Sequence, residues 1–384
     1  MKIVIDDKIP FIRGAFEPYA EVVYLAGAKT RPEDVKDADA LITRTRTACN
    51  EALLKGSSVK MIATATIGFD HIDTAWVEAN GIEWTNAPGC NSWSVKQYVS
   101  AVLCTLAREK GLKFEDLTLG VVGVGNVGTK VAEAARIFGC RVLLNDPPRV
   151  RANDFPTIPG VGNDAFTDLD TLVRESDIIT LHVPLTKEGE DATWHLFDAA
   201  RLSGLRKDQI LINSSRGPVV DNAALRKVLE KGSVRAAVLD VWEGEPDLDP
   251  ELVRLLAITT PHIAGYSADG KANGTTMSVQ AVARKFGISA LYDWKASGVP
   301  DPAQPLAFTV EAAGKGLQQV LEEAVLYTYD PHRDSDPLRA DLGAFERLRG
   351  DYPVRREPTA FTVTLRGGTP AQADAIGRLG FTVK

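Results

Sequence analysis

The chain has 384 residues, with 44 basic and 51 acidic side chains, a formal net charge of −7 and an apolar fraction of 44%. At about 100–200 residues per domain, this length predicts two or three domains, and the composition excludes a disordered chain or a collagen-like repeat. The mild acidity and the absence of a lysine-rich face argue against binding to nucleic acid or to a membrane surface, so small molecules are the expected partners.

The first part of the chain alternates short β-branched runs with amphipathic stretches. Each run is bounded by Gly, Pro, Asp or Asn, and the runs cover residues 2–6, 22–25, 41–43, 61–64 and 82–85. Strands separated by segments long enough to cross over are typical of a parallel sheet with helices on both faces. We therefore predict an α/β, doubly wound, flavodoxin-like domain over residues 1–94, to which the chain returns at about 270–294.

A second series of runs follows, and these are almost continuously apolar. They cover residues 117–123, 141–146, 177–182, 209–213, 234–240 and 258–260. This pattern is typical of parallel strands that are buried on both faces, so residues 95–269 are predicted to form a second doubly wound, Rossmann-like domain. Apolar residues at helical spacing predict connecting helices over Ser92–Lys110 and residues 275–294. If the chain crosses between the domains through these helices, a cleft opens between them.

The C-terminal part begins with linker chemistry, since Gly298, Pro300 and Pro302 lie close together. Residues 298–384 are predicted to form a small α+β module with an alternating strand at 360–365 and a short helix and strand from residue 370. Helically spaced apolar residues precede these elements: Leu317, Val320, Leu321, Val325 and Leu326. About 85 residues bury only a limited core, so we expect the module to pair across a two-fold axis into a homodimer. The alternative is that its apolar faces dock onto the chain's own substrate domain and leave a monomer.

Cysteine usage and the start of the chain indicate the compartment. The four cysteines are widely spaced and form no C-x-x-C pair, and the chain has only five histidines, so neither a disulfide framework nor a metal site is expected. Asp6 and Asp7 stand where a secretory peptide needs its apolar segment, and no run of 18 apolar residues occurs. We therefore expect a cytoplasmic protein with reduced thiols.

The strongest local motif is the Gly-Val-Gly-Asn-Val-Gly sequence at residues 123–128. Alone, it could be only a tight connection between a strand and a helix. Here it follows an apolar strand, opens a helix and precedes a second strand that ends in Asp146, which completes a βαβ unit. Gly123 permits the turn, Gly125 lets the backbone approach a pyrophosphate, and Gly128 allows close helix packing. Asp146 would bind the ribose hydroxyls and repel a 2′-phosphate, so NAD is predicted rather than NADP, a preference that Arg149 weakens slightly.

Three later residues with reactive or charged side chains each follow a predicted strand, at the edge where open α/β sheets bind ligands: Arg216, Glu245 and His262. Oxidation of a 2-hydroxy acid by hydride transfer needs a base for the hydroxyl proton, a group that orients the base and a cation for the carboxylate. His262 can be the base, Glu245 can orient it and stabilise its charge, and Arg216 can bind the carboxylate. Each alone could be structural, but their order after a dinucleotide motif favours catalysis.

On segments 121–128, 213–217, 240–246 and 262–266, the chain resembles the D-isomer-specific 2-hydroxyacid dehydrogenase family. The resemblance implies that Arg216, Glu245 and His262 occupy the catalytic positions. It also implies two sets of binding residues. The NAD pocket would be lined by Gly123, Gly125, Asn126, Val127, Gly128, Asp146, Ser214, Ser215, Arg216, Asp240 and Gly265, and the substrate would contact Thr45, Thr66 and Tyr266.

Further segments resemble one branch of that family, which oxidises a phosphorylated sugar acid and carries a C-terminal dimerisation extension. They include residues 64–71, 86–91 and 146–149, and residues 329–330, 333–339 and 345–352 of the tail. The resemblance therefore implies a homodimer that acts on a small phosphorylated 2-hydroxy acid. Two features depart from the branch: residues 152–166 form a longer segment, and Arg46 is an additional arginine.

The phosphate of such a substrate requires a cation other than Arg216. Arg44 is the leading candidate, because it follows a predicted strand and directly precedes Thr45. Further candidates are the tail arginines, Arg347, Arg349, Arg355 and Arg356. Two other functions remain open: oxidation of a different 2-hydroxy acid such as 3-phosphoglycerate, and NAD sensing by a non-catalytic protein of the same fold.

Overall fold

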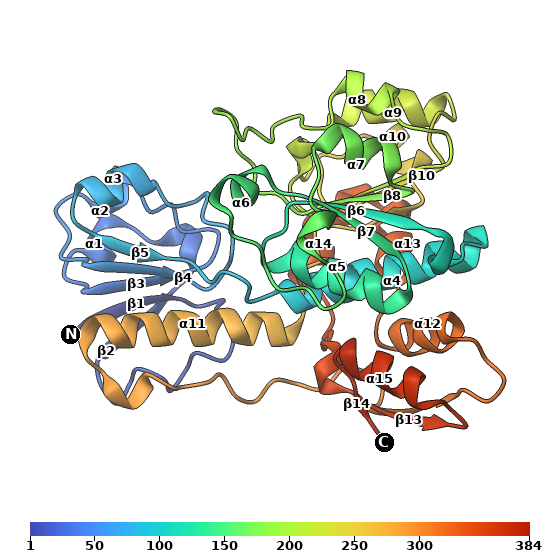
Figure 1. The fold of residues 1–384 in the computed structure, drawn as a ribbon. Helices are drawn as coiled ribbons and strands as arrows, with labels where there is room; N and C mark the ends of the chain where they lie inside the picture. The colour runs from blue at the N-terminus through green and yellow to red at the C-terminus, as the bar shows by residue number, and fades with distance from the viewer. The chain divides into compact units, whose positions relative to one another are not determined.

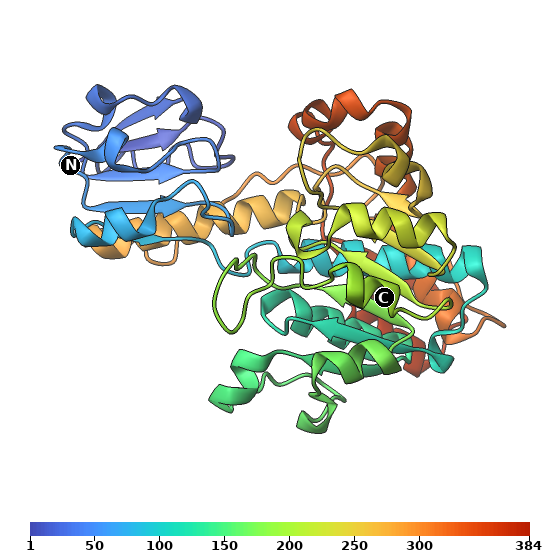
Figure 2. The same cartoon turned by 90° about the horizontal axis from the view of Figure 1, so that it is seen from above.

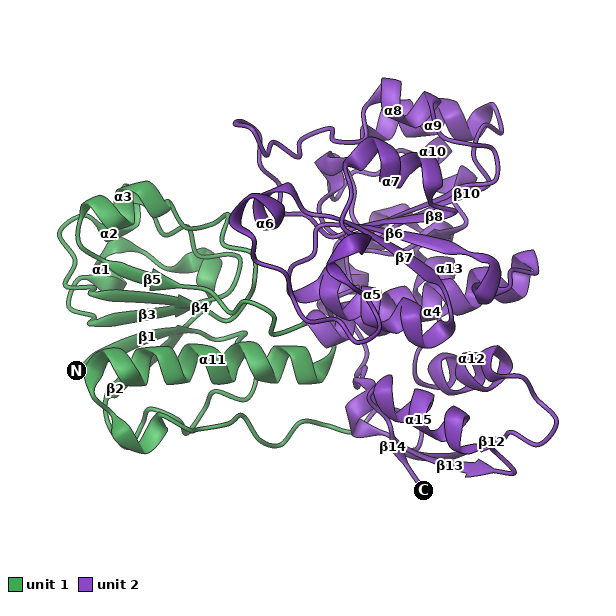
Figure 3. Cartoon of the chain, in the orientation of Figure 1, with its two compact units in different colours: residues 1–91, 267–301 green, residues 92–266, 302–384 purple.

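The computed structural model describes all 384 residues, and the chain folds into two compact units. The first unit contains Met1–Asn91 and Ser267–Asp301, and the second contains Ser92–Tyr266 and Pro302–Lys384 (Figure 3). The tail after Pro302 thus belongs to the same compact unit as the glycine motif. No helix combines the length and the apolar character that crossing a membrane would require.

The first unit is built on a five-stranded parallel sheet with strand order β2-β1-β3-β4-β5. The strands are β1 (Lys2–Asp6), β2 (Glu21–Leu25), β3 (Ala40–Thr43), β4 (Met61–Thr64) and β5 (Glu83–Thr85), and the helices are α1 (Pro32–Val35), α2 (Glu51–Leu54), α3 (Thr74–Ala79) and α11 (Ala268–Phe286). All five strands lie where they were predicted, to within one residue at each end.

Alternation along the strands explains the layers of this unit. In β1, Ile3 and Ile5 pack in a core that includes Val279 and Val282 of α11, whereas Val4 packs in a second core with helices α1 to α3. The sheet is therefore covered on both faces, with α11 on one side (Figures 1 and 2).

The predicted bounds of helix 275–294 were wrong at both ends. The helix begins at Ala268, where the Ser267 hydroxyl accepts a hydrogen bond from the Gly270 amide, and it ends at Phe286 because Gly287 adopts a left-handed conformation with φ of 73°.

The second unit contains a six-stranded parallel sheet with strand order β11-β10-β9-β8-β6-β7. Its strands are β6 (Thr118–Val122), β7 (Arg141–Asn145), β8 (Ile178–Leu181), β9 (Ile210–Asn213), β10 (Ala236–Leu239) and β11 (Ile258–Thr259). Its helices are α4 (Ser92–Lys110), α5 (Asn126–Phe138), α6 (Pro147–Ala152), α7 (Leu169–Glu175), α8 (Ala199–Ser203), α9 (Asn222–Glu230) and α10 (Pro250–Leu255). The strand order reverses between β6 and β8, which is the switch point where doubly wound sheets bind ligands.

The longer segment 152–166 extends this sheet at its β7 edge. Phe166 forms a parallel bridge with Leu144 of β7 and an edge-on ring contact with Phe155, while Ile158 is buried. The segment therefore packs onto the unit as an additional edge and is not a free loop.

The tail adds a three-stranded parallel sheet with strand order β12-β13-β14. Its elements are β12 (Ala307–Glu311), α12 (Leu317–Thr328), α13 (His332–Ala340), α14 (Phe345–Gly350), β13 (Thr362–Arg366), α15 (Pro370–Arg378) and β14 (Thr382–Val383). Helix α12 packs against α4, α5 and α15. Val320, Leu321 and Val325 are consequently buried in the same core as α4. Most of the apolar face that was expected to need a partner molecule is thus covered by the chain itself.

Candidate active site

The three motif glycines have different surroundings in the turn between β6 and α5. Gly123 has φ of 88°, and a Cβ there would lie 2.7 Å from the His182 backbone. A Cβ at Gly128 would lie 1.9 Å from the Gly123 carbonyl oxygen, so only glycine allows α5 to pack this closely. A Cβ at Gly125 would meet no atom within 4 Å. The open side of the turn is therefore at Gly125, where the backbone can approach a pyrophosphate.

Asp146 lies at the end of β7 and links the glycine turn to α6. Its carboxylate accepts hydrogen bonds from the Val124 amide at 2.8 Å and from the Arg149 amide at 3.2 Å. The Arg149 guanidinium is 3.9 Å from Asp146 and 2.6 Å from Asp154. Because two carboxylates already neutralise Arg149, it has little capacity to attract a 2′-phosphate.

The loop after β9 contains the predicted serines and Arg216. Ser215 donates its hydroxyl hydrogen to Asn213 at 2.8 Å, and Arg216 donates to the Ser215 carbonyl at 2.9 Å. The Ser214 hydroxyl is buried and has no hydrogen-bond partner in the chain. A buried hydroxyl without a partner is costly, so a bound polar ligand would satisfy it. The open turn at Gly125 and this hydroxyl both fit a dinucleotide.

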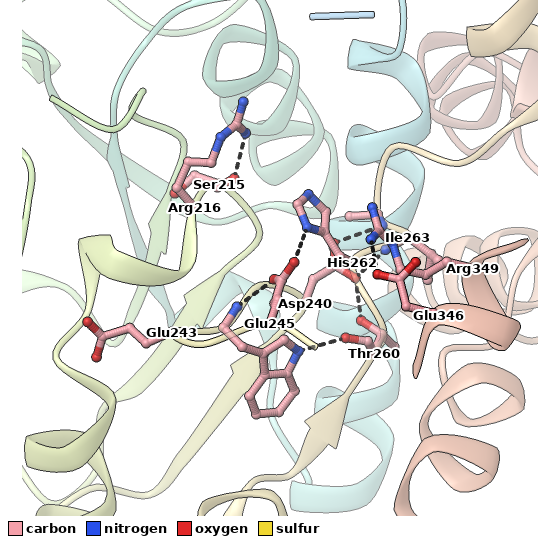
Figure 4. A network of polar contacts seen from close by, with 12 residues as sticks. Ser215, Arg216, Asp240, Glu243, Glu245, Thr260, His262, Ile263, Glu346 and Arg349 are labelled. Carbon is pink, nitrogen blue, oxygen red and sulfur yellow. Dashed lines mark hydrogen bonds and ion pairs between the residues drawn. The ribbon is translucent and has the colours of Figure 1, made fainter. Parts of the chain in front are cut away.

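His262 and Glu245 form a hydrogen-bonded pair with 2.9 Å between Nδ1 and Oε2 (Figure 4). The other Glu245 oxygen accepts the Trp242 amide at 2.9 Å. Burial alone would raise the pKa of Glu245, but the hydrogen bond and charge of His262, the Trp242 amide and the charge of Arg349 together lower that pKa. The carboxylate therefore stays ionised and can stabilise a protonated imidazole. Since Glu245 occupies Nδ1, His262 has Nε2 available for a substrate proton.

Asp240 holds the loop that carries His262. Its buried carboxylate accepts hydrogen bonds from the Thr260 hydroxyl at 2.6 Å and from the Ile263 and Ala264 amides at 2.8 and 2.9 Å. His262 itself has φ of 56°, in the left-handed region that non-glycine residues rarely adopt. The contacts of Asp240 and Gly265 with NAD, implied by the resemblance, remain predictions.

The tail holds the same loop from its carbonyl side, which the sequence did not reveal. Arg355 is buried and donates to the Ile263 and Ala264 carbonyls at 3.0 and 2.6 Å. Its other donor lies 3.3 Å from the Tyr352 hydroxyl, which in turn donates to Asp334 at 2.8 Å. Asp240 thus binds the amides of Ile263 and Ala264, and Arg355 binds the carbonyls of the same two residues. Because Arg355 is enclosed by these contacts, it is not accessible to a phosphate.

A second tail arginine lies beside Tyr266. Arg349 on α14 donates to the Tyr266 hydroxyl at 3.2 Å. The structure therefore brings Tyr266 close to the His262 loop and to a cation that the sequence analysis named only as one of several candidates.

The substrate-binding candidates of the first unit lie at the ends of β3 and β4. The Arg44 guanidinium donates to the Lys8 carbonyl at 3.2 Å, and the Arg44 carbonyl accepts the Thr64 hydroxyl at 3.1 Å. Thr66 donates to the Gly68 carbonyl at 2.9 Å, and Thr45 is exposed. These residues are grouped within their own unit, and their contact with substrate stays a prediction.

A second histidine–glutamate pair was not expected from the sequence. His195 Nε2 lies 2.7 Å from Glu243, and its ring stacks on Trp194 with a centroid distance of 3.8 Å. The second Glu243 oxygen accepts the Asn222 amide at 2.8 Å. This glutamate therefore ties His195 to the start of α9.

Comparison with known proteins extends this picture. Residues 94–264 match the family model described as the NAD binding domain of D-isomer specific 2-hydroxyacid dehydrogenases, and residues 303–380 match a domain of unknown function. The erythronate-4-phosphate dehydrogenase of Bacteroides fragilis is 50% identical over 366 residues, which cover 95% of this chain and 99% of that protein. The Proteus mirabilis protein of the same name is 40% identical over 384 residues, with 99% of both chains covered.

The chain belongs to the erythronate-4-phosphate dehydrogenase family. It is an NAD-dependent dehydrogenase of the D-isomer specific 2-hydroxyacid type, as the sequence motifs predicted. A solved structure of D-lactate dehydrogenase from Aquifex aeolicus, complexed with NAD and lactic acid, is similar with a TM-score of 0.61 and 26% identity. That match covers 78% of this chain and 100% of the lactate enzyme. The matched NAD binding domain and this similar structure support the doubly wound fold and the NAD cofactor.

Proposed function

We propose that the protein oxidises 4-phospho-D-erythronate at C2 with NAD and forms 2-oxo-3-hydroxy-4-phosphobutanoate, a step in the synthesis of pyridoxal 5′-phosphate. The observation that carries the proposal is the pair of His262 and Glu245, 2.9 Å apart, in a chain 50% identical to an erythronate-4-phosphate dehydrogenase over nearly its full length. NAD, when bound, supplies the acceptor for the C2 hydride.

In this reaction the chain's own residues accept the hydroxyl proton, stabilise the imidazolium that results and bind the substrate carboxylate. His262 Nε2 accepts the proton of the C2 hydroxyl, and ionised Glu245 stabilises the imidazolium that forms. Arg216 binds the carboxylate and the developing carbonyl oxygen through its paired N–H donors. Arg44, Thr45, Thr66 and Tyr266 contact the remainder of the substrate. Asp146 binds the adenosine ribose and selects NAD over NADP.

The same proposal includes a cytoplasmic homodimer. All four cysteines are buried and unpaired, which fits a reducing compartment. By the resemblance, generic 2-hydroxyacid dehydrogenases lack this tail. The tail exposes Leu317, and the partly buried rings of Phe308 and Tyr327 stack with their centroids 3.8 Å apart. These groups support an interface between two copies through the tail.

A substrate panel tests the proposed reaction. The purified protein with NAD is given 4-phospho-D-erythronate, 3-phospho-D-glycerate and D-lactate, and NADH absorbance is recorded. We expect the highest kcat/KM with 4-phospho-D-erythronate. A higher value with 3-phospho-D-glycerate would assign a different substrate, and negligible turnover of every acid would indicate an NAD-sensing protein.

A further inference from the structure

We propose that Arg349, on helix α14 of the tail, binds the phosphate group of the substrate. The inference rests on the proposed function, because it names the group that reads the phosphorylated end. It also gives a catalytic-site role to a segment that the family model describes only as a domain of unknown function.

The position of Arg349 next to the catalytic loop is the first support. Its Nη2 lies 3.2 Å from the Tyr266 hydroxyl, and its guanidinium carbon lies 5.7 Å from the Tyr266 ring centroid. Phe345 contacts the same guanidinium at 5.6 Å. Tyr266 follows the His262 loop directly in sequence, so Arg349 is held at the edge of that loop by two aromatic rings.

The charge of Arg349 is the second support. It contributes to the lowered pKa of Glu245, so its positive charge is felt at the His262–Glu245 pair. Its carboxylate neighbour on the same helix, Glu346, is 3.5 Å away, which is long for a charge-assisted hydrogen bond. Its Nε is buried and has no hydrogen-bond partner in the chain. The guanidinium therefore has donor capacity that a phosphate would satisfy.

Two other tail arginines differ in these respects. Arg355 is 4% exposed, and its two Nη groups are committed to backbone carbonyls and Tyr352, although its Nε also has no partner. Arg347 is 66% exposed and lies 3.6 Å from Asp341. Of these three, only Arg349 combines partial burial and proximity to the His262–Glu245 pair with Nη groups that no backbone carbonyl holds.

The geometry of the substrate determines which group Arg349 meets. In a 4-phosphorylated 2-hydroxy acid, the reacting C2 lies between the carboxylate at C1 and the chain that leads to the phosphate. His262 must approach C2, and Figure 4 shows Arg216 and Arg349 on opposite sides of His262 in that view. With Arg216 at the carboxylate, the phosphate extends toward Arg349, where paired N–H donors match its oxygens.

The test compares Arg349→Ala with wild type on 4-phospho-D-erythronate and on D-erythronate, which lacks only the phosphate. We expect kcat/KM for the phosphorylated acid to fall roughly 10–100-fold, mainly through KM, with a change of less than about threefold for D-erythronate. Arg349→Lys should recover part of the loss because it restores the charge. Arg347→Ala, on the same helix, is the matched control and should behave like wild type.

Equal losses on the two acids would overturn the proposal, since Arg349 would then act on something other than the phosphate. If another phosphorylated 2-hydroxy acid proves to be the substrate, the proposed function fails, but the comparison with its dephosphorylated form still tests Arg349. Calorimetry with inorganic phosphate and the NADH-loaded protein requires no turnover at all. Binding that is weaker in Arg349→Ala than in Arg347→Ala supports the assignment, and equal binding in the two variants overturns it.

Discussion

Three histidines of the second unit are hydrogen-bonded to glutamates: His195, His262 and His332. His262 is the one that we propose as the base, and His195 is the most informative comparison. Glu245, the partner of His262, accepts the Trp242 amide with its second oxygen, within the loop that follows β10. The partner of His195 instead binds the start of α9 through the Asn222 amide. A histidine with an acidic partner is therefore not sufficient evidence of a base, and the two can be separated experimentally.

We expect His262→Ala to lower kcat by roughly 10²–10⁴-fold, because the C2 hydroxyl would lose its proton acceptor. NADH binding, followed by fluorescence, should be nearly unchanged. His195→Ala is the control and should keep kcat within a few-fold of wild type. Near-normal turnover by His262→Ala would refute its assignment as the base.

Asp146 is expected to set the preference for NAD. In Asp146→Asn, an oxygen remains for the Val124 amide, whereas the charge that repels a 2′-phosphate is lost. We expect the ratio of kcat/KM for NAD over NADP to fall roughly 10–100-fold. Steady-state rates with both cofactors measure this ratio. The control is Asp154→Asn, which removes the charge of the other carboxylate beside Arg149 and should change this ratio much less. Equal ratios in the two variants would show that the charge of Asp146 does not select the cofactor.

At the scale of elements, local sequence information predicted the strands and the turn. Continuous apolar runs identified β6 and β8, and the glycine spacing identified the start of α5, since each signal lies within the element that it specifies. Helix α11 was misplaced because its true ends depend on the Ser267 cap and the left-handed Gly287, which outweighed the apolar periodicity. Both terminal signals, a serine before the helix and a glycine after it, are present in the sequence.

The contacts of the tail with the loop that carries His262 could not be predicted in the same way. Arg355 contacts Ile263, which lies more than 90 residues earlier in the sequence. Nothing in the local sequence of Arg355 distinguishes it from the exposed Arg347. Likewise, Ser335 of α13 accepts the Thr259 amide of β11, and Arg339 donates to the carbonyls before that strand. These contacts show that α13 covers the edge of the NAD-binding sheet.

This packing makes Arg355 a positioning residue for His262. In Arg355→Met, two carbonyls lose a buried charged donor, so we expect kcat to fall about tenfold or more and stability to fall by about 1–3 kcal/mol. NADH affinity should change little, because the glycine turn is untouched. The exposed Arg366 of β13 offers a control in Arg366→Met, which should retain wild-type kcat and stability. A stability loss in Arg355→Met with unchanged kcat would limit Arg355 to a purely structural role.

At the scale of the whole molecule, the packing of the tail changes how its role in assembly must be tested. Val320, Leu321 and Val325 are buried against α4, so a chain truncated before the tail would expose part of the core of the NAD-binding unit. Truncation would then confuse loss of folding with loss of pairing. Substitutions of exposed apolar residues avoid this problem, because such residues contribute little to the stability of the monomer.

We expect the full chain to sediment as a homodimer at micromolar concentration, with twice the 41.5 kDa mass of one copy. Leu317, 38% exposed at the start of α12, is the tail residue to change, and Leu317→Glu should weaken the dimer by placing a charge in the apolar interface. Val150→Glu, at an exposed valine on α6, is the matched control and should remain dimeric. A monomeric wild-type chain, or a Leu317→Glu variant as dimeric as Val150→Glu, would remove this face of the tail from the interface.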